Sequence, residues 1–261
     1  MSSAGLGLTV LPERTGRSSD GCLSMYVAPD EWPQPSACYI LSYSKIYSLF
    51  LATHELMTLF LQDGDRRELE KKAKEEGRLP PGQSLTLKWP VLHYGSVPRF
   101  DEANWDFKIS GEVTAPVKLF WKEFRALPQT EVTSDFHCVT RWSRLNNTWK
   151  GVLFTEVLKL VTPKSEAKHV LVLAEEGYTS NIPLEDLRRP NVLFAFEHDG
   201  LPLSADHGGP LRLVVPHLYA WKSVKWVRGF MLLDEERLGF WERNGYHAYG
   251  DPWKEQRYSG V

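Results

Sequence analysis

The stretch DFHCVTRWSRLNNTWKGV (135–152) decides how this chain is interpreted. It places Cys138 between a predicted strand and a helix that we expect to start near Gly151. Two cations follow the cysteine, at Arg141 and Arg144. Cationic neighbours lower the pKa of a thiol and favour thiolate, the form that binds metals or attacks carbon. A lone cysteine is also commonly a buried core residue, so this segment alone leaves both interpretations open.

A second stretch, DHGGPLRLVVPHLYAWKSVKWV (206–227), collects groups that suit an anion. Two glycines allow the backbone to approach a ligand closely, and the strand after them carries Arg212. Lys222, Ser223 and Lys225 follow after a turn. Arginine presents a planar fork to phosphate, lysine a point charge and serine a hydroxyl. These residues would hold one phosphorylated ligand; the alternative is a strand pair with ordinary solvated cations.

Two weaker segments accompany these. EEGYTSNIPLEDL (175–187) offers Thr179 as a neutral hydrogen-bonding group, although it is equally typical of a turn and a helix cap. PVLHYGSVPRF (90–100) places His93 near a Gly-Ser turn, where a histidine is more often structural than functional.

Composition restricts the class of function. The 261 residues include 31 basic and 33 acidic side chains, so no overall positive field recruits nucleic acid. Three scattered cysteines form no CxxC or CxxCH motif, which leaves iron–sulfur clusters, covalent haem and structural zinc without ligands. The same cysteine usage favours a reducing compartment, and no export signal is recognised in the first residues, so we expect a cytoplasmic protein.

The chain changes character near residue 64. Residues 1–37 are rich in Ser, Gly and Pro and predict loop or disorder. Residues 38–61 are apolar but contain charged side chains, which favours a buried or interfacial helix over a membrane span. We therefore predict an N-terminal extension over residues 1–64 and one cofactor-binding domain over 65–261.

Within that domain strands predominate, and the predicted class is α+β. A charged helix is expected over 65–76, ending at Gly77. Apolar residues at helical spacing predict helices over 116–127 and 152–161. Strands are predicted for LTLKWPVL (85–92), WDFKISG (105–111), HVLVLAEE (169–176), VLFAFEHDG (192–200), LRLVVP (211–216) and VKWVRGFMLL (224–233).

Taken in this order, the stretches resemble the sulfite oxidase family of molybdopterin enzymes, in particular small prokaryotic members without haem or dimerisation domains. The resemblance runs from about Arg78 to the C-terminus. It rests on DFHCVTRWS followed by WxGV, on GYTSNIPL, on GGPLRLVVP with the following WKSVKW, and on GFWERNGYHAYGDPW (239–253).

The resemblance implies a molybdopterin cofactor whose molybdenum is ligated by the thiolate of Cys138. A soft sulfur donor suits this metal. The implied contacts to the pterin and its phosphate are His93, Thr179, His207, Arg212, Lys222, Ser223, Val224 and Lys225.

One departure concerns the substrate. This chain has CVTRWSR where animal and plant sulfite oxidases carry a Cys-Ala-Gly-Asn-Arg-Arg run, so their sulfite-binding arginine pattern does not transfer. We expect a two-electron oxygen-atom transfer, or a related reduction, on a small oxo-substrate that meets Arg141. Because the chain offers no haem or cluster ligands, electrons would pass to or from a separate partner or a soluble acceptor. The alternatives are a non-catalytic molybdopterin carrier and, more weakly, a cysteine hydrolase using Cys138 and His137.

Overall fold

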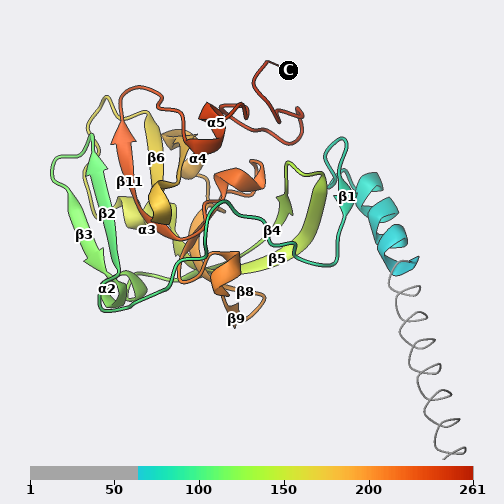
Figure 1. The fold of residues 1–261 in the computed structure, drawn as a ribbon, viewed down its shortest axis with the longest axis horizontal. Helices are drawn as coiled ribbons and strands as arrows, with labels where there is room; N and C mark the ends of the chain where they lie inside the picture. Colours follow the sequence, from blue (N-terminus) through green and yellow to red (C-terminus); the bar gives the residue numbers. More distant parts are fainter. Residues whose placement is uncertain (1–63, 261) are drawn as a thin grey trace, which may run out of the picture. The chain divides into compact units, whose positions relative to one another are not determined.

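The computed structural model describes residues 64–260, which fall within one compact unit, Leu56–Val261. Figure 1 shows two sheets joined by short helices, which confirms the predicted α+β class. The expectations for residues 1–37 and 38–61 lie outside the described residues, and the boundary at residue 64 stays a prediction. No helix in the described part is long and apolar enough to cross a membrane.

The first sheet has six strands and carries the cysteine. Its central path is β1 (Ser84–Leu85), β5 (Trp142–Leu153), β8 (Leu193–His198) and β10 (Arg212–Val214). β4 (Thr130–His137) forms a hairpin with β5, and β9 (Leu201–Pro202) pairs with β8. Only β1 runs parallel to its neighbour in this sheet. Because β1 pairs with β5, a strand from the start of the domain borders the β4–β5 hairpin.

The second sheet has five strands in the order β3 (Val117–Phe120), β2 (Asp106–Gly111), β11 (Val227–Leu233), β6 (His169–Ala174) and β7 (Thr179–Pro183). β2 and β11 pair in parallel, and the other neighbours are antiparallel. The α-helices that follow strands are short: α2 (Trp121–Arg125), α3 (Phe154–Leu158), α4 (Leu184–Leu187) and α5 (Phe240–Arg243). Single 3-10 turns are η1 (Glu175–Gly177), η2 (Ala205–His207) and η3 (Ala220–Lys222).

Aromatic side chains from both sheets meet in the main core. Phe194 of the first sheet lies edge-on to Phe107 of the second, with ring centroids 5.1 Å apart, and stacks on Phe230 at 6.3 Å. All three rings are fully buried, and burial of each contributes about 1.5–3 kcal/mol. This contact joins the sheet that carries the cysteine to the sheet that carries Thr179.

Strand predictions over 105–111, 169–176, 192–200, 211–216 and 224–233 are confirmed, although each observed strand is shorter. Residues 64–75 are helical, as predicted, and the chain leaves the helix at Gly77 with φ +65°. The strand predicted over 85–92 is wrong beyond Leu85, and the segment from there to β2 crosses the domain as an irregular trace (Figure 1).

Two helix predictions need correction. Residues 117–120 form β3 rather than the first turn of a helix, because Val117 and Leu119 alternate with exposed neighbours and pair with β2. The segment around Gly151 is strand, and α3 starts only at Phe154. Gly151 suits this place because a Cβ there would lie 2.0 Å from the carbonyl oxygen of Phe194 on β8.

Candidate cofactor site

Cys138 occupies the tight turn between β4 and β5. Its backbone amide donates to the carbonyl of Trp142 at 2.8 Å, and its carbonyl accepts from the amide of Arg141 at 3.0 Å. Arg141 has φ +71°, a left-handed conformation that closes the turn. Gln83 donates to the same Cys138 carbonyl at 3.0 Å, so the segment before β1 supports the turn from outside. The turn therefore fixes the position of the cysteine through backbone bonds.

The thiol itself is 7% exposed and lies among aromatic rings. Cys138 clusters with Val139, Tyr219 and Trp221, and its Sγ is 3.1 Å from the hydroxyl oxygen of Thr140. Burial raises the pKa of this thiol, while the Thr140 hydrogen bond and the charge of Arg257 act in the opposite direction. A soft, shielded sulfur at this position suits a thiophilic metal.

The expectation of a lowered thiol pKa is wrong, because burial raises the pKa of Cys138. Arg144 forms an ion pair with Asp199 at 2.6 Å and lies 3.0 Å from the ring nitrogen of His198, on the first sheet. The nearby cation is Arg257, from the C-terminal tail. Because Arg257 lies 119 residues after Cys138, no local sequence pattern indicates that it is near the thiol.

Arg212 is a buried cation that has no acidic partner among residues 64–260. Its side chain lies on β10, is 2% exposed and donates only to two carbonyls, those of His207 and Ser223, each at 2.9 Å. Its Nε has no hydrogen-bond partner in the described part of the chain. Burial lowers the pKa of this guanidinium to about 9. Since a buried charge is costly unless it is paired, this arrangement indicates the position of an anion that residues 64–260 do not supply.

Lys225 adds a second cation at the same place. Its ammonium donates to the carbonyl of Asp206 at 2.5 Å, and within residues 64–260 no carboxylate forms an ion pair with it. Burial and the charge of Arg212 lower the pKa of Lys225 to about 7. The charge of Cys138 also acts on Lys225, which indicates that Lys225 is near the thiol. Two cations without an ion pair in residues 64–260, one of them near a soft sulfur, fit a phosphate-bearing ligand that presents a metal.

His207 and an unpredicted tryptophan line the same position. The His207 ring stacks on Trp89 with centroids 3.9 Å apart, and its Nε2 lies 3.2 Å from the Trp89 carbonyl. Trp89 also faces the guanidinium of Arg212 at 5.5 Å from the ring centroid. The exposed His93 packs edge-on against Trp226 at 5.3 Å. Trp89 therefore lies beside Arg212 and His207, in a segment predicted as strand, whereas His93 contacts neither of them.

The structure does not bring every predicted residue into contact with this anion position. Lys222 is fully buried and bonds to Glu242 at 2.6 Å and to the carbonyls of Asn181 and Ala248, so its ammonium is already occupied. The hydroxyl of Ser223 accepts from the amide of Val215, which leaves its carbonyl as its contribution to Arg212.

Two further predicted residues lie in the second sheet and in the core, at Thr179 and Val224. The buried hydroxyl of Thr179 has no partner in the described part and remains able to bond a ligand. Val224 is a buried core residue whose backbone accepts from Leu213.

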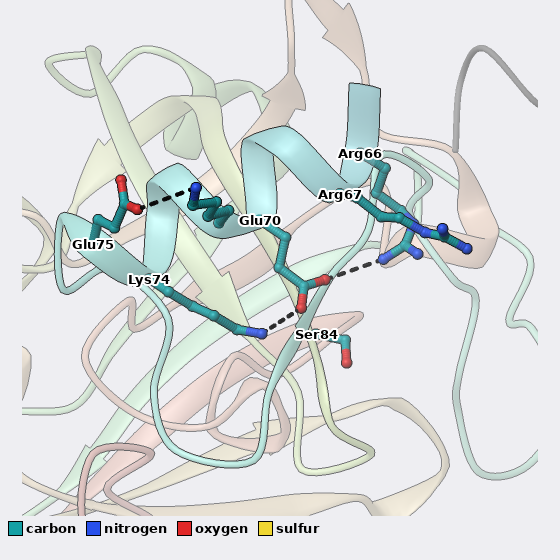
Figure 2. Close-up of a pocket in the computed structure, with 7 residues that line it drawn as sticks. Arg66, Arg67, Glu70, Lys74, Glu75 and Ser84 are labelled. Atoms are coloured by element: carbon teal, nitrogen blue, oxygen red, sulfur yellow. Dashed lines mark hydrogen bonds and ion pairs between the residues drawn. The ribbon is translucent and has the colours of Figure 1, made fainter. Parts of the chain in front are cut away.

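A separate hollow of about 460 Å³ lies beside the helical residues 64–75. Figure 2 shows Glu70 between Lys74 and Arg66, to which it bonds at 2.6 and 3.1 Å. Glu70 also accepts from the amide of Leu85 at 3.1 Å, so this helix is tied to β1. The hollow is lined by charged helix residues and Ser84 and contains no residue of the candidate site.

Comparisons with known proteins agree with this geometry. The model of the oxidoreductase molybdopterin binding domain matches residues 94–241, which contain the turn at Cys138 and both unpaired cations. The uncharacterized oxidoreductase YuiH of Bacillus subtilis is 45% identical over 190 residues, covering 72% of this chain and 96% of that protein. Sulfite oxidase of Arabidopsis thaliana is 31% identical over 225 residues, covering 69% of this chain and 57% of the plant protein.

A solved structure shows the same fold. The sulfane dehydrogenase SoxCD of Paracoccus pantotrophus superposes with a TM-score of 0.52 at 22% sequence identity, covering 59% of this chain and 43% of that one.

The fold and the site define a cofactor-dependent oxidoreductase of the α+β class. The chain belongs to the oxidoreductase molybdopterin binding domain family, and its cofactors are molybdopterin and molybdenum. The predicted family, fold class and enzymatic nature are thereby confirmed, and the alternative of a non-catalytic carrier is not supported.

Proposed function

We propose that this enzyme catalyses a two-electron oxygen-atom transfer, or the related reduction, at a molybdenum ligated by Cys138. The observation that carries the proposal is the buried Arg212 with the partly buried Lys225 near it, neither of which forms an ion pair with a carboxylate of residues 64–260. When bound, the cofactor supplies the redox chemistry, and the protein holds it, orients it and excludes water. Relatives named sulfite oxidase, protein-methionine-sulfoxide reductase and nitrate reductase support oxygen-atom chemistry on small oxo-compounds.

The proposed roles follow the geometry. Arg212 and Lys225 bind the phosphate of the pterin, with His207 and Thr179 as further polar contacts and His93 at the edge of the site. The buried ion pair of Lys222 and Glu242 positions the site through Trp221. Glu242 also accepts a hydrogen bond from the indole nitrogen of Trp221 at 2.9 Å, and Trp221 belongs to the cluster around the thiol.

Arg141 is the proposed substrate contact. Its side chain is exposed, and no carboxylate of residues 64–260 pairs with it. The alternative partner, Asp135, bonds instead to Arg78 at 2.6 Å. A guanidinium held at the turn of the metal ligand would orient an oxygen atom of a polar or anionic substrate through its fixed fork of donors.

We further propose a cytoplasmic location and electron exchange with a separate protein or a soluble acceptor. The cysteine content supports a reducing compartment, and Cys138 carries a free thiol. Fractionation of the native cell against compartment markers tests the location.

Replacing the ligand tests the proposal directly. X-ray absorption of molybdenum-loaded Cys138→Ala should show one sulfur fewer around the metal, while Cys38→Ala should match the wild type. An unchanged sulfur count in Cys138→Ala would remove this residue from the coordination sphere. Once a substrate is found, Arg141→Gln should raise KM or lower kcat at unchanged metal and pterin content, whereas loss of cofactor would assign Arg141 to the pterin.

A further inference from the structure

Arg257 lies outside the region matched by the family model, yet its side chain enters the turn of the metal ligand. Its Nη1 donates to the carbonyl of Val139 at 2.6 Å, and its Nη2 donates to the carbonyl of Pro81 at 3.3 Å. One side chain therefore bonds both the cysteine turn and the segment before β1. The residue is only 5% exposed, so solvent does not compete for these bonds.

The charge of Arg257 is only partly compensated. Its nearest carboxylate is that of Glu255, 3.6 Å from Nη2, and the Glu255 side chain is 47% exposed. The guanidinium carbon lies 5.0 Å from the ring centroid of Tyr219, another member of the cluster around the thiol. The Nε is buried without a partner in the described part of the chain. A positive charge thus persists at low dielectric beside the turn.

We propose that Arg257 is a positioning residue for the metal ligand, which holds the Cys138–Arg141 turn through the Val139 carbonyl and sets a positive charge beside the ligating sulfur. The proposal rests on the role of Cys138 given under the proposed function. A nearby positive charge stabilises the more negative, reduced state of a metal–thiolate centre, so Arg257 raises the reduction potential. The C-terminal tail thereby adjusts the reduction potential of a metal centre whose ligand, Cys138, lies in the region matched by the family model.

Charge and hydrogen bonding are separated by three variants of the loaded enzyme. Arg257→Lys keeps the charge and a single donor group, Arg257→Gln keeps a donor group but removes the charge, and Arg257→Met removes both. The readouts are the molybdenum midpoint potential, from redox titration followed by electron paramagnetic resonance, and the molybdenum content per protein. We expect the potential to fall in Arg257→Gln, to stay close to the wild type in Arg257→Lys, and the metal content to drop in Arg257→Met.

Glu255→Gln provides the opposing change. Removing this carboxylate leaves the Arg257 charge without compensation, so the potential should rise slightly, by less than it falls in Arg257→Gln because Glu255 is half exposed to solvent. A purely structural role of the tail predicts no such opposite shifts. Arg144→Gln is the matched control. It removes a guanidinium that lies on β5 and is already paired with Asp199, so it should leave the potential unchanged.

Unchanged potentials in Arg257→Gln and Glu255→Gln would overturn the electrostatic role, and full metal content with an unaltered X-ray absorption spectrum in Arg257→Met would overturn the positioning role. The sulfur count in Cys138→Ala is measured separately. If that count falls as expected while the Arg257 variants behave like the wild type, only this inference fails.

Discussion

The pH dependence of cofactor binding tests the anion position most sharply. Burial and the charge of Arg212 lower the pKa of Lys225 from 10.5 to about 7. A bound phosphate stabilises the charged form, so above pH 7 binding requires Lys225 to take up a proton. The affinity should therefore weaken as pH rises through the pKa of the free site.

The magnitude follows from that pKa. Lys225 is about 90% charged at pH 6 and about 10% charged at pH 8, and each pH unit above the pKa costs about 1.4 kcal/mol for reprotonation. The Lys225 contribution should make binding about tenfold weaker at pH 8 than at pH 6. The phosphate also titrates, with a second pKa of about 6, but this effect is common to every variant.

The stability of the cofactor-free chain should change in the opposite direction. The folded-state pKa of Lys225 lies below its unfolded value, so the charged form destabilises the fold. That penalty is fully present below pH 7 and is relieved as pH rises from about 7 to 10.5, where the unfolded chain binds more protons. Stability rises over a window in which cofactor binding weakens.

Lys225→Arg isolates the effect, because a guanidinium keeps its charge over this range. Protein is loaded with limiting cofactor at pH 6 and pH 8, and its pterin content is measured by fluorescence after oxidation. The pterin content at pH 6 divided by the content at pH 8 should be larger for the wild type than for Lys225→Arg. For the wild type this ratio should approach tenfold where occupancy is low. Lys150→Arg, whose lysine pairs with Glu197 on the strand surface, controls for the substitution itself. Equal ratios in the wild type and Lys225→Arg would refute the reasoning.

Three further predictions concern binding and stability. Arg212→Ala should reduce pterin occupancy at limiting cofactor by about ten- to a hundredfold, since a charge-assisted contact contributes about 1.5–3 kcal/mol, with cooperative thermal unfolding retained. Gly151→Ala should lower the thermal midpoint by several degrees, because its Cβ would lie 2.0 Å from the Phe194 carbonyl oxygen; an unchanged midpoint would contradict the β5–β8 pairing. Asp106→Asn should flatten the acid limb of urea unfolding: ion pairing with Arg228 and two lysines lowers the Asp106 pKa from 3.8 to about 2, so its contribution is present above pH 3.8 and lost as pH falls towards 2.

The sequence predicted strands best where β-branched and aromatic residues form buried runs, as in β6 and β11. The prediction failed where the spacing of apolar residues fits both a helix and a strand. Val117 and Phe120 fit a helical face with Phe124 and Leu127, but residues 117–120 pair with β2 as a strand. The β4–β5 hairpin was missed because its long second strand, with Asn146 at φ +55°, lacks a simple alternation of apolar and polar residues.

The candidate site was predicted to a similar extent. The family resemblance, and not spacing in the sequence, identified the residues Cys138, His207, Arg212 and Lys225. Trp89 was not predicted as a site residue, since nothing local distinguishes a tryptophan that stacks on His207 from one that fills the core.

The ion pairs formed by cations near the site explain why the presence of a charged residue in the sequence did not by itself identify a phosphate contact. Lys222 and Lys225 lie three positions apart, yet Lys222 is paired with Glu242, whereas Lys225 forms no ion pair with a carboxylate of residues 64–260 and only feels the charge of Asp206. Glu242 comes from α5, and sequence spacing does not reveal which lysine it will reach. A cation is most available to a ligand where the fold brings no carboxylate into an ion pair with it, and this favours Arg212 and Lys225 as the proposed phosphate position. Arg257 differs, because it has one weak, half-exposed partner in Glu255, so its charge at the cysteine turn is only partly compensated.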